Sequence, residues 1–170
     1  LDVMNFHKLC NSHFDKFRKV NGRDVLIEAK QTLPGKDEMN VQWPTALSYT
    51  ADDPDFQYDA IVCDEGQDFK DEFWFAIEFL LKNYDKSPLY VFSDENQNIY
   101  SRSSNFPIEK EPYLLIDNCR NTKQIHNLAY TYYKGDNVNP PNNHGNEVKV
   151  ISANSIDQQV KKIVMEITNL

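Results

Sequence analysis

The sequence predicts an α/β fold in which a parallel sheet is flanked by helices. Residues 58–63 and 89–92 are apolar on both faces, and each run ends in a polar cluster, as is typical of buried parallel strands. Between them, residues 71–83 carry an apolar stripe at helical spacing. The stripe consists of Phe73, Ile77, Leu80 and Leu81. A strand, a helix and a second strand in this order indicate a βαβ unit with parallel strands.

An amphipathic helix is predicted near the start of the chain, over residues 3–20. Leu9, Phe14 and Phe17 recur at helical spacing among polar residues, and Gly22 follows as a stop signal. The apolar residues define one face of this helix. We count it among the helices that flank the predicted sheet.

The segment between this helix and the first strand is less regular. Residues 25–29 form a short apolar stretch that fits either a helix or a strand. Residues 32–55 combine several prolines, a glycine and several acids. Because these residue types favour turns, we expect a surface excursion with one short helix near residues 41–48.

After the second strand the alternation of strands and helices continues. Residues 113–116 form a candidate third strand, and residues 122–134 a candidate helix. Prolines, a glycine and several asparagines in residues 137–146 indicate a linker. Beyond the linker, residues 148–151 and 155–169 are expected to form another strand and another helix.

The composition limits the classes of function. The chain has 18 Lys and Arg against 26 Asp and Glu, a net charge of -8, which argues modestly against strong nucleic-acid binding by this chain alone. No apolar run reaches membrane-spanning length, and no secretory signal opens the chain. The cysteines are widely spaced, which argues against a zinc site or a disulfide framework and favours a reducing cytoplasm. They are Cys10, Cys63 and Cys119.

The strongest functional signal is the acidic segment Asp64-Glu65-Gly66-Gln67-Asp68, directly after the first predicted strand. In open parallel sheets, ligands bind at the carboxyl ends of strands. Two adjacent carboxylates at such an end are costly unless a cation or a proton transfer uses them. One carboxylate can bind magnesium, and the next can orient an attacking water. The plainer alternative is a solvated strand end or an acidic cap on the following helix.

Two further segments follow the next two predicted strands. In residues 93–100, Gln97 offers both a donor and an acceptor, and Tyr100 offers a stacking face for a base. Arg120 lies between the third strand and the following helix, where it could reach a phosphate oxygen. A polar turn and a surface ion pair are the corresponding plainer alternatives.

Together, these segments resemble motifs II, III and IV of UvrD/Rep-like superfamily I DNA helicases, whose usual patterns are DExxQD, GDxxQxIY and LxxNYRS. They occur in the family's order and at compatible spacing, and the resemblance covers residues 5–130 best. Residues 5–7 are also similar to the Thr-Phe-His segment upstream of motif II. Ser93, Cys119 and Asn5 replace the usual Gly, Tyr and Thr.

The resemblance implies a RecA-like P-loop NTPase core that uses ATP and Mg²⁺. On the family pattern, Asp64 corresponds to the magnesium-binding aspartate of Walker B, and Glu65 to the water-activating glutamate. Gln97 matches the glutamine that senses the γ-phosphate, and Gln67 belongs to the same coupling network. Arg120 matches the arginine finger, which contributes a factor of roughly 10³–10⁵ in rate in related NTPases.

The same resemblance implies a nucleic-acid partner. Phe6 and His7 lie in a segment that is on the DNA side in the family, and Tyr100 matches an aromatic position near the bound single strand. The expected partner is single-stranded or partly duplex DNA, with RNA left open. No membrane is implied.

The phosphate-binding P-loop is missing, because no GxxxxGK[ST] occurs in the sequence. We expect residues 1–137 to be a partial first RecA-like domain truncated at its N-terminal strand. Residues 138–147 are then a linker, and residues 148–170 the start of a second RecA-like domain. The missing P-loop segment and the rest of the second domain are expected elsewhere in a longer parent chain. This chain alone is expected to lack ATPase activity.

Two alternatives stay open at this point. A related nucleic-acid-stimulated ATPase could translocate, or act on RNA, without separating strands. A degenerate, non-catalytic interaction domain of the same fold could have lost its P-loop. A GxxGxGKT segment in the parent reading frame upstream of Leu1 would argue against the degenerate domain.

Overall fold

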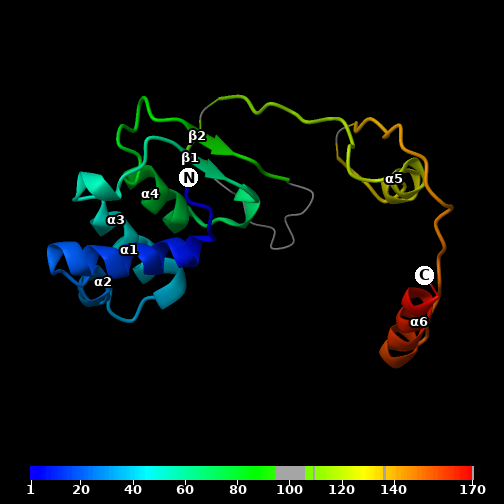
Figure 1. The fold of residues 1–170 in the computed structure, drawn as a ribbon, viewed down its shortest axis with the longest axis horizontal. Helices are drawn as coiled ribbons and strands as arrows, with labels where there is room; N and C mark the ends of the chain where they lie inside the picture. Colours follow the sequence, from blue (N-terminus) through cyan, green and yellow to red (C-terminus); the bar gives the residue numbers. More distant parts are fainter. Residues whose placement is uncertain (95–105, 109, 136, 170) are drawn as a thin grey trace. The chain divides into compact units, whose positions relative to one another are not determined.

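The computed structural model describes residues 1–94, 106–108, 110–135 and 137–169 (Figure 1). The chain divides into two compact units, Leu1–Glu111 and Pro112–Leu170. Each unit is described by itself below. The extent of a first RecA-like domain to residue 137 stays a prediction.

The first unit combines helices with a small parallel sheet. In its described part, β1 (Ile61–Cys63) and β2 (Leu89–Val91) pair in parallel, with Ile61 opposite Leu89. The α-helices of this unit are α1 (Phe6–Asn21), α2 (Val25–Thr32), α3 (Trp43–Thr50) and α4 (Asp71–Phe79). Shorter turns are η1 (Glu38–Gln42), η2 (Pro54–Phe56) and η3 (Gly66–Asp68). The predicted α/β class and the order β1–α4–β2 are confirmed.

Both strands lie where the sequence predicted them, but β1 and α4 are shorter than expected. The Tyr58 N–H donates to the Leu80 carbonyl at 2.7 Å, and the Lys82 N–H donates to the Tyr58 carbonyl at 3.0 Å. The chain before β1 therefore pairs with the segment after α4 instead of extending the strand. Because Leu80 and Lys82 use their backbone groups in this pairing, α4 ends at Phe79.

Helix α1 confirms the predicted N-terminal helix. It begins at Phe6 because the Asn5 side chain accepts a hydrogen bond from the Lys8 N–H at 2.9 Å. It ends before Gly22, whose φ of 70° is readily adopted only by glycine. Its buried face packs into the core of the first unit. The buried residues are Phe6, Cys10, His13, Phe14 and Phe17.

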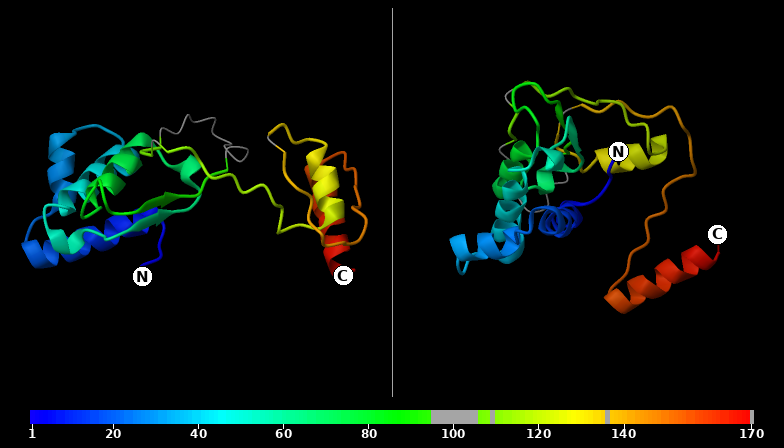
Figure 2. Two further views of the ribbon diagram at one scale, coloured as in Figure 1. Left: turned by 90° about the horizontal axis from the view of Figure 1, so that it is seen from above. Right: turned by 60° about the vertical axis from the view of Figure 1, so that its left-hand side comes forward.

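The short helix expected near residues 41–48 forms as α3, and residues 32–39 are largely exposed as expected, but the expectation that this helix lies on the surface is wrong, because α3 is buried in the core of the first unit. This helix contacts α1, α2 and α4 (Figures 1 and 2). Leu47 and Thr50 on α3 are fully buried. In the sequence the prolines indicate surface turns. Pro44 and Pro54 instead occupy the first turns of α3 and η2, where a missing N–H is tolerated.

The four aromatic residues of α4 lie only partly in the core. Phe73 and Trp74 are buried, whereas Phe75 and Phe79 are each 49% exposed. Four aromatic residues in one short helix surround its circumference, and the core covers one side only. Phe75 and Phe79 therefore face away from the core of the first unit.

The second unit contains α5 (Lys123–Tyr130) and α6 (Ile156–Thr168) in its described residues. The strands expected at residues 113–116 and 148–151 do not form. Instead, the Ile116 carbonyl accepts from the Asn139 N–H at 2.6 Å, within the predicted linker. An apolar run becomes a strand only where a neighbouring strand supplies hydrogen bonds. No residue of α6 is buried, so its predicted apolar stripe is exposed.

The helices of the described residues have at most 16 residues. None of them combines the length and the apolar character that crossing a bilayer requires. The longest of them, α1, has charged residues such as Lys8 and Asp15 between its buried residues along the sequence.

Candidate functional site

The acidic segment predicted as a site begins directly at the carboxyl end of β1. The Phe92 N–H donates to the Cys63 carbonyl at 2.8 Å, and the Gly66 N–H donates to the Phe92 carbonyl at 2.8 Å. These two bonds continue the pairing beyond β1 and β2. They hold η3, Asp64 and Glu65 beside the end of β2. This is the carboxyl-terminal edge of the parallel sheet, where ligands usually bind.

Asp64 and Glu65 are exposed at this edge, and the backbone between them is tightly turned. Asp64 Oδ1 accepts a hydrogen bond from the Glu65 N–H at 3.0 Å. Within the described ranges, Glu65 is the one non-glycine residue with a positive φ, at 53°. This left-handed conformation costs about 1–2 kcal/mol for a residue with a Cβ. Such strain is concentrated at functional sites, which supports a role for Glu65.

Gln67 joins the two strand ends through its buried side-chain amide. Its Nε2 donates to Glu65 Oε2 at 2.6 Å, and its Oε1 accepts from the Asp94 N–H at 3.0 Å. The Gln67 side chain is buried, so both bonds are partly shielded from water. The amide therefore fixes the Glu65 carboxylate and ties it to the segment that follows β2. We call these three residues the Glu65–Gln67–Asp94 link.

Gly66 is required by the close approach of the acidic segment to β2. A Cβ at this position would lie 2.5 Å from Val91 Cγ1, 3.2 Å from Phe106 Cε1 and 3.4 Å from the Phe92 carbonyl oxygen. The separation from Val91 is too short for Val91 to stay in place, and the one from Phe106 is tight. The third position of the acidic segment therefore excludes a side chain for a packing reason.

We predict that Gly66→Ala lowers the free energy of unfolding by about 1–3 kcal/mol, because the new methyl overpacks the end of β2. Chemical denaturation of both proteins measures the change. In a Val91→Ala background the same substitution should cost less than half as much, since the nearest clashing methyl is gone. Equal penalties in the two backgrounds would contradict the steric explanation.

The positive φ of Glu65 leads to a second prediction. We expect Glu65→Gly to be more stable than Glu65→Ala by about 0.5–1 kcal/mol, because both lose the bond to Gln67 but only glycine adopts the positive φ freely. Denaturation curves of both variants give the difference. Glu72, in the first turn of α4, is the matched control: there alanine should be the more stable by about 0.5–1 kcal/mol. The same order at both positions would argue against strain at Glu65.

The predicted phosphate-sensing residues cannot all be placed around Asp64. Gln97 and Tyr100 lie outside the described residues. Arg120 lies in the second unit, where it is exposed and its N–H donates to Asn118 Oδ1 at 3.2 Å. The convergence of Asp64, Gln97 and Arg120 on one phosphate group therefore stays a prediction.

Phe6 and His7, expected on the nucleic-acid side, lie at the start of α1. The Phe6 ring is buried and stacks on Phe73, with ring centroids 4.0 Å apart and planes 4° apart. It is therefore not presented to a base in this structure. His7 is half-buried, with its ring edge toward Trp43 at a centroid distance of 5.8 Å. Among the described residues, no hydrogen-bond partner reaches its Nε2.

A buried polar network in the first unit had no sequence signal. His13 Nδ1 lies 3.0 Å from Thr50 Oγ1, and His13 Nε2 lies 2.8 Å from the Tyr58 hydroxyl. Burial, with a smaller contribution from Lys16, lowers the pKa of His13 to about 4, and Asp2 opposes the shift. These partners are far apart in the sequence, so only the fold brings them together. The network holds α1, α3 and the chain before β1 in place.

The chemistry of the acidic edge suits a magnesium ion that also contacts a nucleotide. Mg²⁺ is commonly held by one or two carboxylates together with phosphate oxygens and water. Asp64 and Glu65 are exposed carboxylates at the edge of the sheet, accessible to a hydrated ion. In the part of the chain that the structure describes, no group of three His, Cys, Asp or Glu residues could hold a metal by itself.

Comparison with known proteins assigns no family. No protein-family model matches the sequence, and a search of curated proteins finds no match. The function is therefore inferred from the three motif-like segments and from the geometry at the ends of β1 and β2.

Proposed function

We propose that this chain is part of an ATP-dependent superfamily I helicase or translocase, which couples ATP hydrolysis to movement on single-stranded DNA. The resemblance of three segments to motifs II, III and IV supports this. The observation that carries the proposal is the Glu65–Gln67–Asp94 link, because it connects the motif II-like segment to the motif III-like segment. A purely structural strand end has no need of a strained glutamate held by a buried amide.

In this proposal Asp64 holds Mg²⁺ and Glu65 orients the attacking water. The magnesium ion supplies charge neutralisation for the phosphate oxygens. Gln67 acts as a positioning residue, because its Nε2 restrains the Glu65 carboxylate at 2.6 Å. A restrained carboxylate holds a water in line with the phosphate more often than a freely rotating one.

The link also offers a route from the nucleotide to the nucleic acid. Asp94, which Gln67 contacts, opens the segment that contains Gln97 and Tyr100. In the proposal Gln97 senses the γ-phosphate, Tyr100 contacts the bound strand and Arg120 stabilises transition-state charge. The RecA-like core, the DNA preference and the cytoplasmic location are parts of the same proposal.

The phosphate cradle has to come from another polypeptide segment, because the sequence contains no GxxxxGK[ST]. Asp64 and Glu65 have little to act on without backbone amides and a lysine that hold the β- and γ-phosphates. The missing GxxxxGK[ST] motif favours a second candidate, a non-catalytic interaction domain of the same fold. The following experiment separates the two candidates.

The test is nucleic-acid-stimulated ATP hydrolysis by the full polypeptide that contains this chain. We expect Glu65→Gln to lower kcat by about 10²–10⁴-fold and Arg120→Ala by about 10³-fold or more, with little change in folding. Glu111→Gln is the control for loss of an exposed carboxylate. No hydrolysis by the wild-type protein would support the non-catalytic domain. Hydrolysis without strand separation would favour a translocase that does not unwind.

A further inference from the structure

A groove on the first unit lies between α3 and α4, and no residue of the acidic segment 64–68 lines it. Its volume is about 510 Å³. Thr45, Ser48 and Tyr49 line one side, and Phe75 and Phe79 line the other. The described contacts join α3 to α4 directly, so the floor of this groove is formed by packed helices.

Phe75 and Phe79 give the groove an exposed aromatic wall. Each side chain is 49% exposed, and their ring centroids are 4.7 Å apart. The buried side of α4 already fills the core with Phe73 and Trp74. Two adjacent exposed rings that the core does not need are typical of interaction surfaces.

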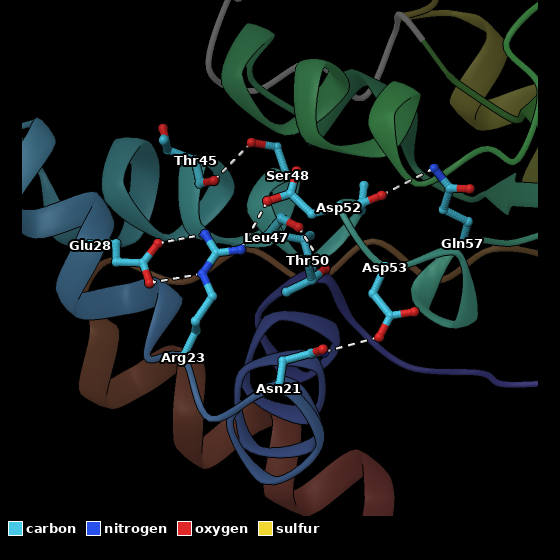
Figure 3. A network of polar contacts seen from close by, with 11 residues as sticks. Asn21, Arg23, Glu28, Thr45, Leu47, Ser48, Thr50, Asp52, Asp53 and Gln57 are labelled. Atoms are coloured by element: carbon cyan, nitrogen blue, oxygen red, sulfur yellow. Dashed lines mark hydrogen bonds and ion pairs between the residues drawn. The ribbon is translucent and has the colours of Figure 1, made fainter.

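The Thr45 and Ser48 hydroxyls of the groove already donate their hydrogen atoms to backbone carbonyls. Ser48 Oγ donates to the Thr45 carbonyl at 2.8 Å (Figure 3). Thr45 Oγ1 donates to the Val41 carbonyl at 2.9 Å. What these hydroxyls offer a ligand is therefore oxygen lone pairs. Together with the electron-rich faces of two phenyl rings, they form a surface that favours a cation.

The charges around the groove have the same preference. Glu72 and Glu78 lie three residues before and after Phe75, so they border the Phe75–Phe79 stripe on its two sides. Neither α3 nor α4 contributes a Lys or Arg. At the end of the groove, Asp52 is already paired with Arg23 at 3.0 Å, so the preference for a cation rests on Glu72 and Glu78 (Figure 3).

We propose that the groove between α3 and α4 docks a basic segment of a partner protein, rich in arginine and in aliphatic residues. Its guanidinium groups stack on Phe75 and Phe79 and pair with Glu72 and Glu78. Its aliphatic residues fill the apolar part of the groove. Nucleic acid does not fit, because phosphates would face these carboxylates. A second copy of this chain, with a net charge of -8, is also disfavoured by repulsion.

Fluorescence anisotropy of the full chain with labelled peptides tests the proposal. The probe is a twelve-residue peptide that alternates arginine with leucine. One comparison peptide has glutamate in place of arginine, and another has glycine in place of leucine. We expect binding of the first peptide only, weakening as salt rises.

Two double variants locate the binding site. Phe75→Ser/Phe79→Ser and Glu72→Lys/Glu78→Lys should each weaken binding by about tenfold or more. Tyr113→Ser and Glu111→Lys, which change exposed residues elsewhere, should leave it unchanged. Circular dichroism checks that each variant is folded. If the double serine variant does not fold, the charge-reversal variant Glu72→Lys/Glu78→Lys still tests the groove.

Three outcomes would overturn the proposal. The first is equal binding of the arginine and glutamate peptides by the wild-type chain. The second is an unchanged affinity in a folded double variant. The third is dimerisation in sedimentation experiments that the same substitutions abolish, without peptide binding, since this would assign the groove to a second copy.

Discussion

Leu47→Ala is expected to lower the free energy of unfolding by about 2–5 kcal/mol, the largest effect of a single truncation proposed for this chain. Leu47 is 0% exposed and lies on α3, which contacts α1, α2 and α4. Removing its side chain leaves a cavity at the junction of four helices. Because these helices pack closely around α3, they can relax only partly into the space.

Urea denaturation followed by circular dichroism measures this loss. Ile27→Ala is the matched control, because it removes a side chain of the same size from α2 at a position that is 54% exposed. We expect the control to change the free energy of unfolding by about 0.5 kcal/mol or less. Similar losses for both variants would contradict a central position for α3.

His13 is expected to make the stability of the first unit depend on pH. Thr50 Oγ1 donates to the Leu47 carbonyl at 2.7 Å, so it accepts the hydrogen of His13 Nδ1. His13 Nε2 then accepts from the Tyr58 hydroxyl. This neutral tautomer satisfies every group in the network. A protonated ring would place a charge in the core, and its Nε2–H would force the Tyr58 hydroxyl to turn its own hydrogen elsewhere.

The sign of the effect follows from the two pKa values. His13 has a pKa of about 4 in the folded chain, against 6.5 as its ordinary value, because burial disfavours the charged ring. Between these pH values the unfolded chain binds more protons, so stability falls as pH falls from about 6.5 toward about 4. The full effect corresponds to about 3 kcal/mol. Above pH 6.5 the contribution is fully present.

Denaturation at pH 7.5, 5.5 and 4.5 tests this prediction in wild type and His13→Gln. Glutamine offers a donor and an acceptor to the same partners but does not titrate. The stability difference between the two proteins should therefore shift by about 2–3 kcal/mol in favour of the variant between pH 7.5 and 4.5. Other titrating groups are common to both and cancel. Parallel pH profiles would contradict a buried neutral histidine.

Local chemistry explains which elements could be predicted. The N-terminal helix was recognised because an apolar stripe and Gly22 are signals that act within a few residues, whereas its start at the Asn5 cap was not predicted. The acidic segment was recognised because it directly follows a short apolar strand. The strands expected at residues 113–116 and 148–151 were wrong, because a strand depends on a neighbour that local sequence cannot specify.

The sequence by itself determined the β1–α4–β2 order, the position of Asp64 and Glu65 at a strand end, and the resemblance to helicase motifs. Only the tertiary structure decided that Gln67 bridges Glu65 to Asp94, that α3 is buried and that Phe75 is exposed. The physical reason is the distance along the sequence over which each interaction acts. Capping and periodicity act over one or two helical turns, whereas burial and buried hydrogen bonds depend on which distant segments the chain packs together.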